Sequence, residues 1–544
     1  MTHPMLRLAL LGWLLLSIPA SRALAADRPT SVYNPNLLAQ AVDDALDRRW
    51  KQARLVPSGA CNDYEFNRRA WLDLVGMIPS EEAVRQFVAP AESDGPSKQE
   101  NSRRSDKNKS EPDRRQALVE ALLDSPGYGK HGAVLWGNAL VGRGKDLELL
   151  RQIPFREWLA DQLGKNTRID KLVRELLIST GRRSDNPSVG WAMGQKGNHE
   201  DMTGSAARLF LGTQIQCAQC HDHPFDKWKQ RDFYGMAAFF ARVKYDQIII
   251  AESLTELPTG EIRLGGRPEG EIIAPRFLAV DKEASVGSRP RREVLADWIT
   301  SPDNKRFARA IVNRVWAQFF GRGFVHPIDD FSDNNPPSCP EALDALADGF
   351  VHSGYDLKFL VRAITRTRAY QLTSLPSKNN KDDDALFSKH PLRRLMPEQL
   401  VPSVVMSSGI ASNKEVMDNP LVKLILTGIQ QQFIFVFANM DEMTEVSEFK
   451  GTIAQALLMM NGKPIVGATR LHLLHPLALK LLKGSPEEQV ELLFLSTLSR
   501  PPSKAEAQAL VPLVRSTRLP NERLEVCEDL YWALINSAEF TFNH

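Results

Sequence analysis

The sequence is poor in cysteine and has no excess of either charge. It contains five Cys among 544 residues, too few for a disulfide scaffold, and the odd number leaves at least one thiol outside any intramolecular pair. Lys and Arg together number 68 and Asp and Glu 66, a formal net charge of +2. The chain therefore lacks the excess of positive charge that would predict nucleic acid as a partner. The remaining composition, with 43% hydrophobic and 25% charged residues, is that of a globular protein long enough for two or three domains.

Several motifs and long apolar runs are also missing. The sequence has no Gly-rich phosphate loop, no G-x-S-x-G elbow and no H-E-x-x-H helix. Beyond the N-terminal region no segment reaches 18 consecutive apolar residues, and the closest one, Leu421 to Met440, is interrupted by Lys423 and a Gln tract. We therefore predict no transmembrane segment in the mature chain.

The N-terminus has the order of a secretory signal peptide. Arg7 precedes an apolar run from Leu8 to Ala20, and a small-x-small site ends at Ala25. This pattern predicts a cleaved signal peptide over residues 1–25 and a periplasmic or secreted protein, with an uncleaved anchor as the alternative. Cysteines in such a compartment can be oxidised.

The rest of the chain predicts a mainly α fold with two helical domains and a small β-rich insertion between them. Helical periodicity covers residues 27–243 and 285–544; in the helix expected over Arg306 to Phe320, Phe307, Ile311 and Trp316 share one apolar face. Residues 244–284 instead carry short β-rich runs, at 247–250, 261–264 and 271–273. Residues 91–115 have almost no apolar side chain, which predicts a disordered surface insertion.

One short segment carries a specific chemical motif. Cys217-Ala-Gln-Cys220-His221 is C-x-x-C-H, the attachment motif of c-type haem. In that chemistry two thioether bonds hold the porphyrin at the cysteines, and the histidine coordinates the iron. The predicted export supplies the compartment that attachment requires. Two alternatives remain open: a disulfide or free thiols at the two cysteines, and a zinc site that also uses His223.

A low-spin haem iron also needs a sixth ligand. Met236 is the nearest downstream sulfur, although a methionine at this helical spacing is commonly a core residue. His223 is a further possible metal ligand. His131 and His199 are alternatives without positional support.

A second polar cluster lies further along the chain. Arg314 is followed by His326, Asp329 and Asp330. Paired carboxylates beside His and Arg could act as a general acid and base, so these four residues are weak catalytic candidates. The alternative is structural, with the carboxylates capping a helix or binding arginines.

Two further histidines are close enough in the sequence to suggest metal binding. His472 and His475 have i, i+3 spacing, but no acidic residue lies near them in the sequence. Solvated helix residues are the favoured interpretation.

Many motifs of this chain resemble a planctomycete family of secreted proteins of unknown function. In that family a cytochrome-named domain (PSCyt type) precedes a second domain (PSD type). The similarity covers about residue 36 to the last residue. The matching segments are Arg68–Ile78, Ala206–Gly212, Cys217–Asp226, Phe233–Phe239, Arg291–Trp298, Phe307–Trp316, Phe320–Gly323, Asp329–Phe331, Ser353–Leu357, Arg394–Leu400, Gln455–Gly462 and Phe540–His544.

The resemblance implies fold and export more than activity. Relatives are often fused to a cytochrome c domain or to carbohydrate-binding modules, which this chain lacks. Around Phe437 to Asp441 it also departs from a Gly-Arg-Pro segment and a downstream Cys-Glu that relatives carry. The leading hypothesis is electron transfer with an extracytoplasmic redox or cell-surface protein partner. The alternative is an enzyme or binding module for polysaccharide, with Asp329 and Asp330 as acid and base.

Overall fold

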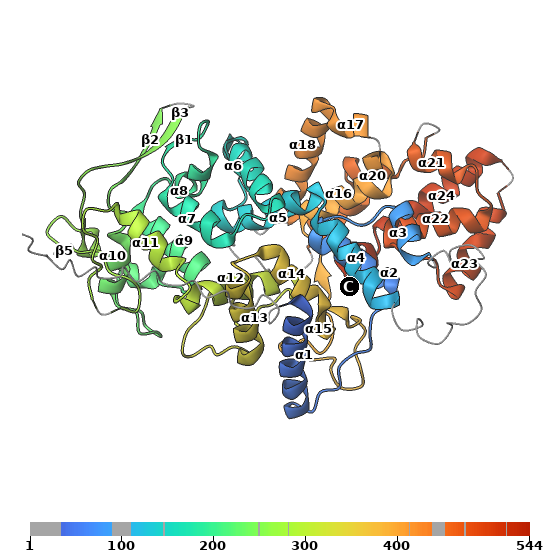
Figure 1. The fold of residues 1–544 in the computed structure, drawn as a ribbon. Helices are drawn as coiled ribbons and strands as arrows, with labels where there is room; N and C mark the ends of the chain where they lie inside the picture. Colours follow the sequence, from blue (N-terminus) through green and yellow to red (C-terminus); the bar gives the residue numbers. More distant parts are fainter. Residues whose placement is uncertain are drawn as a thin grey trace, which may run out of the picture.

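The structure is a computed structural model that describes residues 34–89, 110–144, 147–248, 251–280, 282–412, 414–437, 452–472, 475–517 and 519–544. It is mainly α-helical with a few short strands (Figure 1), which confirms the predicted fold class. The predicted signal peptide, residues 1–25, lies outside the described residues, as does most of the predicted insertion.

The first half of the chain forms helices whose starts are set by capping side chains. Asn34, Asn62, Ser80 and Asn198 each accept a hydrogen bond from a backbone N–H of the first turn that follows. The helices are α1 (Pro35–Gln52), α2 (Asp63–Leu74), α3 (Glu81–Val88), α4 (Ser110–Leu123), α5 (Pro126–Val141), α6 (Leu147–Gly164), α7 (Ile169–Ile178), α8 (Gly190–Gly194), α9 (His199–Leu211) and α10 (Gln230–Ala237).

The end of the predicted insertion at residue 115 differs from the structure, because α4 already begins at Ser110. Arg115 pairs with Asp63 at 2.9 Å, and Arg114 contacts the same carboxylate. These ion pairs tie the first turns of α4 to α2, an interaction that a polar composition alone does not reveal. The rest of the insertion, residues 91–109, lies outside the described residues.

Short strands occupy the predicted β-rich segment. β2 (Val243–Ile248) pairs antiparallel with β3 (Ala251–Glu256), and β3 also pairs with β1 (Gly181–Arg182) from the first half. A second pair joins β4 (Ile262–Arg263) to β5 (Ile272–Ile273). The small sheet therefore recruits a strand from outside residues 244–284.

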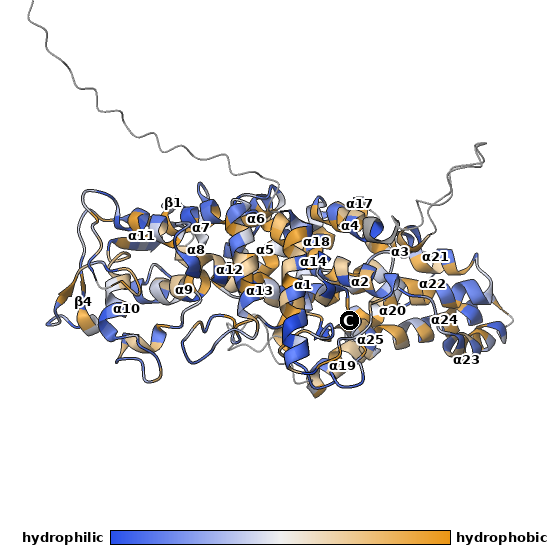
Figure 2. Ribbon diagram, turned by 60° about the horizontal axis from the view of Figure 1, so that its bottom comes forward, coloured by the Kyte–Doolittle hydropathy of each residue, from blue (hydrophilic) through white to orange (hydrophobic). Residues whose placement is uncertain are grey.

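The second half is again helical. Its helices are α11 (Arg291–Ile299), α12 (Lys305–Phe320), α13 (Pro340–His352), α14 (Leu357–Arg366), α15 (Arg368–Gln371), α16 (Pro397–Ser407), α17 (Lys414–Asp418), α18 (Pro420–Phe437), α19 (Ile453–Asn461), α20 (Lys463–Thr469), α21 (Pro476–Leu481), α22 (Pro486–Leu498), α23 (Lys504–Arg515), α24 (Pro520–Ile535) and α25 (Ala538–Thr541), with a strand pair between β6 (Arg393–Arg394) and β7 (Phe542–Asn543). Most helices carry both apolar and polar residues (Figure 2), as expected of helices that pack through one apolar face.

The two halves share their cores. The larger apolar cluster runs from Leu38 in α1 to Phe387, and the smaller one combines Leu72 and Ile78 of the first half with residues 395–540. Helix α2 lies beside the C-terminus (Figure 1) and contributes Phe66 to the larger cluster and Leu72 to the smaller one. The halves therefore pack as one body around α2.

One helix of the second half differs from the others in its exposure. α18 is long and apolar enough to cross a membrane by length and composition, with a mean hydropathy of 1.4 and only 11% of its residues buried. Leu421, Leu424, Ile425 and Phe435 are each more than 60% exposed. Core helices of soluble proteins meet the same length and composition criterion, so this finding alone assigns no span.

Candidate functional site

The C-x-x-C-H motif begins on a single turn of 3-10 helix, η2 (Gln216–Gln219), and Cys220 and His221 follow directly after it. Cys217 and Cys220 are both exposed free thiols, whereas Ala218 between them is fully buried. The buried methyl anchors the turn to the core and directs its two sulfur-bearing residues toward solvent. The other three cysteines are also free, but they are buried.

The histidine of the motif has a defined hydrogen bond. Nδ1 of His221 lies 2.8 Å from the carbonyl oxygen of Asp222. Because a carbonyl can only accept, Nδ1 must be the donor, which places the ring proton there in the neutral form. Nε2 then carries a lone pair, and the ring is exposed to solvent. This is the tautomer that a metal-ligating histidine requires.

The turn is supported by residues of its own half. Gln230 donates from Nε2 to the carbonyls of Gln219 at 3.0 Å and Cys220 at 3.1 Å, and its backbone N–H donates to Asp222 Oδ1 at 2.9 Å. The backbone N–H of His223 donates to the carbonyl of Trp228 at 2.7 Å. Backbone hydrogen bonds thus hold the motif, and its sulfur and imidazole groups remain available.

The candidate sixth ligands lie in contrasting places. Met236 is fully buried in α10 and is therefore a core residue. His131 is also buried, and burial lowers its pKa to about 4. His199 lies at the start of α9, with Nε2 at 3.3 Å from the carbonyl oxygen of Val243. His223 is half-buried two residues beyond the motif, and its Nδ1 accepts from the backbone N–H of Phe225 at 3.3 Å.

The two aspartates of the second cluster have separate partners. Asp329 is buried, accepts from Gln214 Nε2 at 2.7 Å and lies 3.5 Å from an Arg208 nitrogen. Asp330 instead accepts from Asn335 within its own loop, at 3.3 Å on the carboxylate. The carboxylate of Asp329 is thus bound to first-half side chains, as the structural interpretation predicts.

Of the other two members of that cluster, Arg314 contacts the first half, where its Nη2 donates to the carbonyl of Arg208 at 3.5 Å. Arg314 is buried on α12, and His326 lies in the loop that follows this helix. Asn313, which shares this helix with Arg314, was assigned no role from the sequence, yet it shapes the loop. Its Nδ2 donates to the carbonyls of Val325 at 2.9 Å and Ile328 at 3.0 Å. A fully buried Asn on a helix is the signal that could have identified this role, but burial is not readable from sequence.

The remaining metal hypothesis concerns His472 and His475. Their rings lie edge to face with centroids 5.8 Å apart, and His475 is buried while His472 is exposed. Among the described residues, no three or more His, Cys, Asp or Glu side chains form a group that could hold a metal ion.

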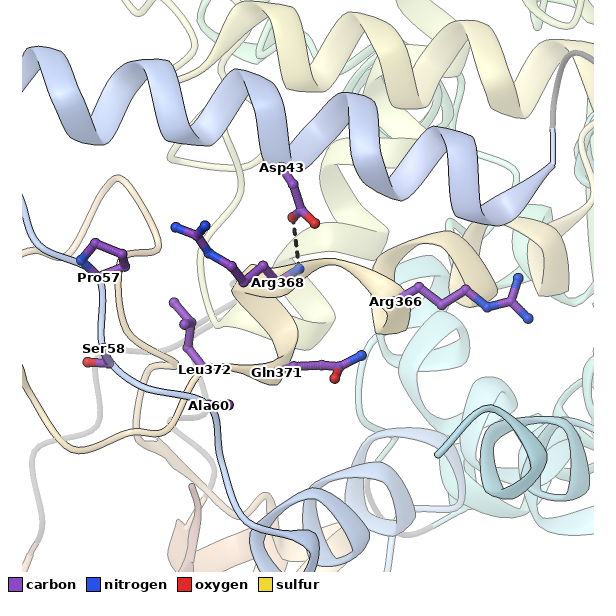
Figure 3. A pocket seen from close by; sticks show the side chains of 8 residues that line it. All are labelled: Asp43, Pro57, Ser58, Ala60, Arg366, Arg368, Gln371 and Leu372. Carbon is purple, nitrogen blue, oxygen red and sulfur yellow. Dashed lines mark hydrogen bonds between the residues drawn. The ribbon is translucent and has the colours of Figure 1, made fainter. Parts of the chain in front are cut away.

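A cavity of about 480 Å³ lies between α1 and α15 (Figure 3). Asp43 accepts a hydrogen bond there from the backbone N–H of Arg368 at 2.8 Å, and burial raises the pKa of this carboxyl group to about 6. Arg366 and Gln371 also line the cavity. Arg368 pairs with Asp47 at 2.7 Å. No sequence pattern indicates this cavity, because its walls come from segments more than 300 residues apart.

The main result of the geometry is that two motifs from distant parts of the sequence meet. The segment that contains C-x-x-C-H contacts residues 329–334 of the second half, as the bond between Gln214 and Asp329 shows. From the sequence alone, the two motifs were interpreted as independent sites.

Comparison with known protein families gives two matches. Residues 41–245 match PSCyt2, described as a protein of unknown function (DUF1549), and residues 291–431 match PSD1, described as a protein of unknown function (DUF1553). The C-x-x-C-H turn lies in the first match and Asp329 in the second. No curated protein and no solved structure matches the chain.

Proposed function

The chain belongs to the two-domain family in which a PSCyt2 domain precedes a PSD1 domain, and from its own residues we propose that it is an exported protein that carries covalently bound c-type haem and transfers electrons. The observation that carries the proposal is the geometry of one turn. Cys217, Cys220 and His221 are all exposed on it, and the imidazole has its Nε2 lone pair free.

The donor set of this turn fits the group. Two free thiols three residues apart suit two thioether bonds, and the adjacent imidazole suits an axial position on iron. When bound, haem would supply one-electron redox chemistry. Cys217 and Cys220 would hold the porphyrin, and His221 would coordinate the iron through Nε2, with Nδ1 held by the Asp222 carbonyl.

The position of the turn also suits electron transfer. The motif lies at the molecular surface, and Phe225, five residues beyond Cys220, is 81% exposed. An exposed aromatic side chain beside a redox group offers a contact surface to a protein partner. We propose an extracytoplasmic redox or cell-surface protein as that partner.

Heterologous expression with a c-type haem maturation system tests the proposal. The purified protein should give a pyridine haemochrome spectrum of thioether-bound haem, at one haem per chain. The Cys217→Ala/Cys220→Ala variant should lose covalent haem. Cys339→Ala, which removes a buried thiol far from the motif in sequence, should retain it.

The outcome also separates the alternatives. A colourless wild-type protein with one zinc ion per chain by elemental analysis would replace haem with a structural metal site. A colourless protein without metal, whose two motif thiols react with an alkylating reagent only after reduction, would identify a disulfide. Either result contradicts the proposed function.

Export is tested on the same material. N-terminal sequencing of protein from the periplasm or the medium should begin at Ala26, the residue after the small-x-small site. A full-length chain that stays with the membrane fraction would contradict cleavage and support an uncleaved anchor.

A further inference from the structure

The segment around the C-x-x-C-H motif is contacted by the second half on both sides of the motif. On the N-terminal side, Gly212 accepts from the backbone N–H of Phe331 at 2.9 Å, and Gln214 donates to Asp329 at 2.7 Å. Between these two residues, Thr213 accepts from Arg306 at 3.2 Å. These contacts fix the chain just before the haem-binding turn.

On the C-terminal side of the motif, a second set of contacts comes from the same loop. Asn334 donates from Nδ2 to the carbonyl of Phe225 at 2.9 Å, and Asp333 pairs with Lys227 at 3.0 Å. Arg306 lies over the ring of the buried Trp228, 5.7 Å from its centroid. The contacts thus fall on residues 212–214 and 225–228, on either side of residues 217–221.

The fit at the first contact is close. Gly212 ends α9 with a φ of +62°, a left-handed conformation that favours glycine. A Cβ added at this position would lie 2.5 Å from Cδ2 of Phe331. The first half therefore carries a residue without a side chain at the point where the second half approaches.

We propose that Asp329, Phe331, Asp333 and Asn334 form a clamp that positions the C-x-x-C-H turn, so that both halves of the chain build the cofactor site. The clamp residues act through the loop backbone and are positioning residues. This inference rests on the proposed haem function for its consequence, which is control of the solvent exposure and potential of the haem. Its structural part can be tested without haem.

The variant Asp333→Asn/Asn334→Ala removes the exposed ion pair and the hydrogen bond to Phe225 without touching buried Asp329. Asn379→Ala is the matched control, because Asn379 is also exposed and also donates from Nδ2 to a distant backbone carbonyl, that of Arg54 at 2.7 Å. In the haem-free protein, the backbone amides of residues 213–230 should exchange hydrogen about tenfold faster in Asp333→Asn/Asn334→Ala than in the wild type. The reason is that losing these contacts makes local opening of the segment more favourable. They should be unchanged in the control.

In the haem-loaded protein, the midpoint potential of the haem tests the positioning role, because a purely structural role of the clamp would leave this potential unchanged. Asn334→Ala leaves the charge unchanged, so its effect on the potential comes from solvent access alone. Greater access of water favours the more highly charged ferric state, so the midpoint potential should become more negative while haem stoichiometry stays at one per chain. Asn379→Ala should keep the wild-type potential.

The two proposals fail in different ways. If the wild-type chain takes up no haem, the proposed function is wrong, and hydrogen exchange still decides whether the clamp positions the turn. The clamp is wrong, and the haem proposal stands, if haem attaches but two results match those of Asn379→Ala: hydrogen exchange in Asp333→Asn/Asn334→Ala and the midpoint potential of Asn334→Ala.

Discussion

Helix α2 and the C-x-x-C-H turn use polar groups in opposite ways. On α2, Arg68 and Arg69 are fully buried; Arg68 donates to the carbonyls of Thr497 and Phe540, both at 2.9 Å. Arg69 donates to the carbonyl of Leu372 at 2.9 Å and pairs with Glu65 at 2.8 Å. The turn keeps its sulfurs and imidazole exposed, and most of its supporting hydrogen bonds are made to backbone carbonyls.

The polar groups of α2 stabilise the fold, whereas those of the turn are placed for contact with solvent or a ligand. Buried charged groups that bind backbone carbonyls of distant segments hold the two halves together, and removing one partner leaves the others unsatisfied. Exposed reactive groups contribute little to stability. The ligand that we propose for the turn would account for their position at the surface.

The largest effect is expected at α2. Arg69→Ala should lower the free energy of unfolding by about 3 to 5 kcal/mol, because several buried carbonyls and Glu65 lose their donor. Urea unfolding followed by circular dichroism measures the change. Arg85→Ala, which removes an arginine whose side chain is 48% exposed, should cost less than about 1 kcal/mol. Similar losses for the two variants would refute the assignment of α2 as the structural centre.

Buried histidines near this network should make stability depend on pH. Burial lowers the pKa of His390 well below 6.5, and the cations Arg69 and Arg393 lower it further. Below pH 6.5 the unfolded state therefore binds a proton that the folded state does not. Stability should fall by about 1.4 kcal/mol per pH unit for each such group between pH 6.5 and 5. Asp43 opposes this trend, since its raised pKa favours the folded state as the pH falls toward about 4.

Unfolding measured at pH 7 and pH 5 for the wild type and for His390→Phe tests this dependence. The variant should reduce the slope, because one neutral buried histidine is gone. An unchanged slope in His390→Phe would show that other groups control the acid sensitivity.

An intermediate effect is expected where the two halves meet beside the turn. Gly212→Ala should cost about 1 to 3 kcal/mol, because alanine disfavours a positive φ and its Cβ would meet the Phe331 ring. Gly428→Ala, at a glycine with no atom within 4 Å of an added Cβ, is the control and should be neutral or slightly stabilising on α18. Equal effects would mean that the close approach at Gly212 relaxes without cost.

The smallest effect on global stability is expected at the exposed side of the turn. Asp333→Asn breaks a pair whose side chains are 82% and 49% exposed, those of Asp333 and Lys227, so the free energy of unfolding should change by about 0.5 kcal/mol or less. Thermal unfolding measures this. A change as large as that of Gly212→Ala would place the loop within the cooperative core and weaken the contrast with α2.

Sequence reasoning predicted the elements that depend on local pattern. The expected helix over Arg306 to Phe320 is α12, Lys305–Phe320, which ends at Gly321 in the left-handed conformation. Two of the three predicted runs contain the strands β4 and β5, and the first run overlaps β2 at residues 247–248, while residues 249–250 lie outside the described residues. β3 was missed because Ala251 to Glu256 has few β-branched or aromatic residues, and its pairing with β1 and β2 determines its structure instead.

Long-range contacts could not be predicted from a single sequence. Nothing in the pattern of α2 shows that Arg68 and Arg69 bind residues near 372, 497 and 540. The contact between Gln214 and Asp329 joins positions 115 residues apart, and it gives Asp329 a supporting contact that its local sequence does not indicate. The Cys and His residues of the site, in contrast, were identified from spacing alone, since their chemistry lies within five consecutive residues.

The most direct test of the haem proposal is the mass of one peptide. Trypsin cleavage after Arg208 and after Lys227 releases Leu209–Lys227, which contains both motif cysteines and His221. After expression with the maturation system and denaturation in acid, this peptide should carry the mass of one haem, with fragment ions that place it on Cys217 and Cys220. The same peptide at its unmodified mass, from protein made alongside a c-type cytochrome that does acquire haem, would contradict the account.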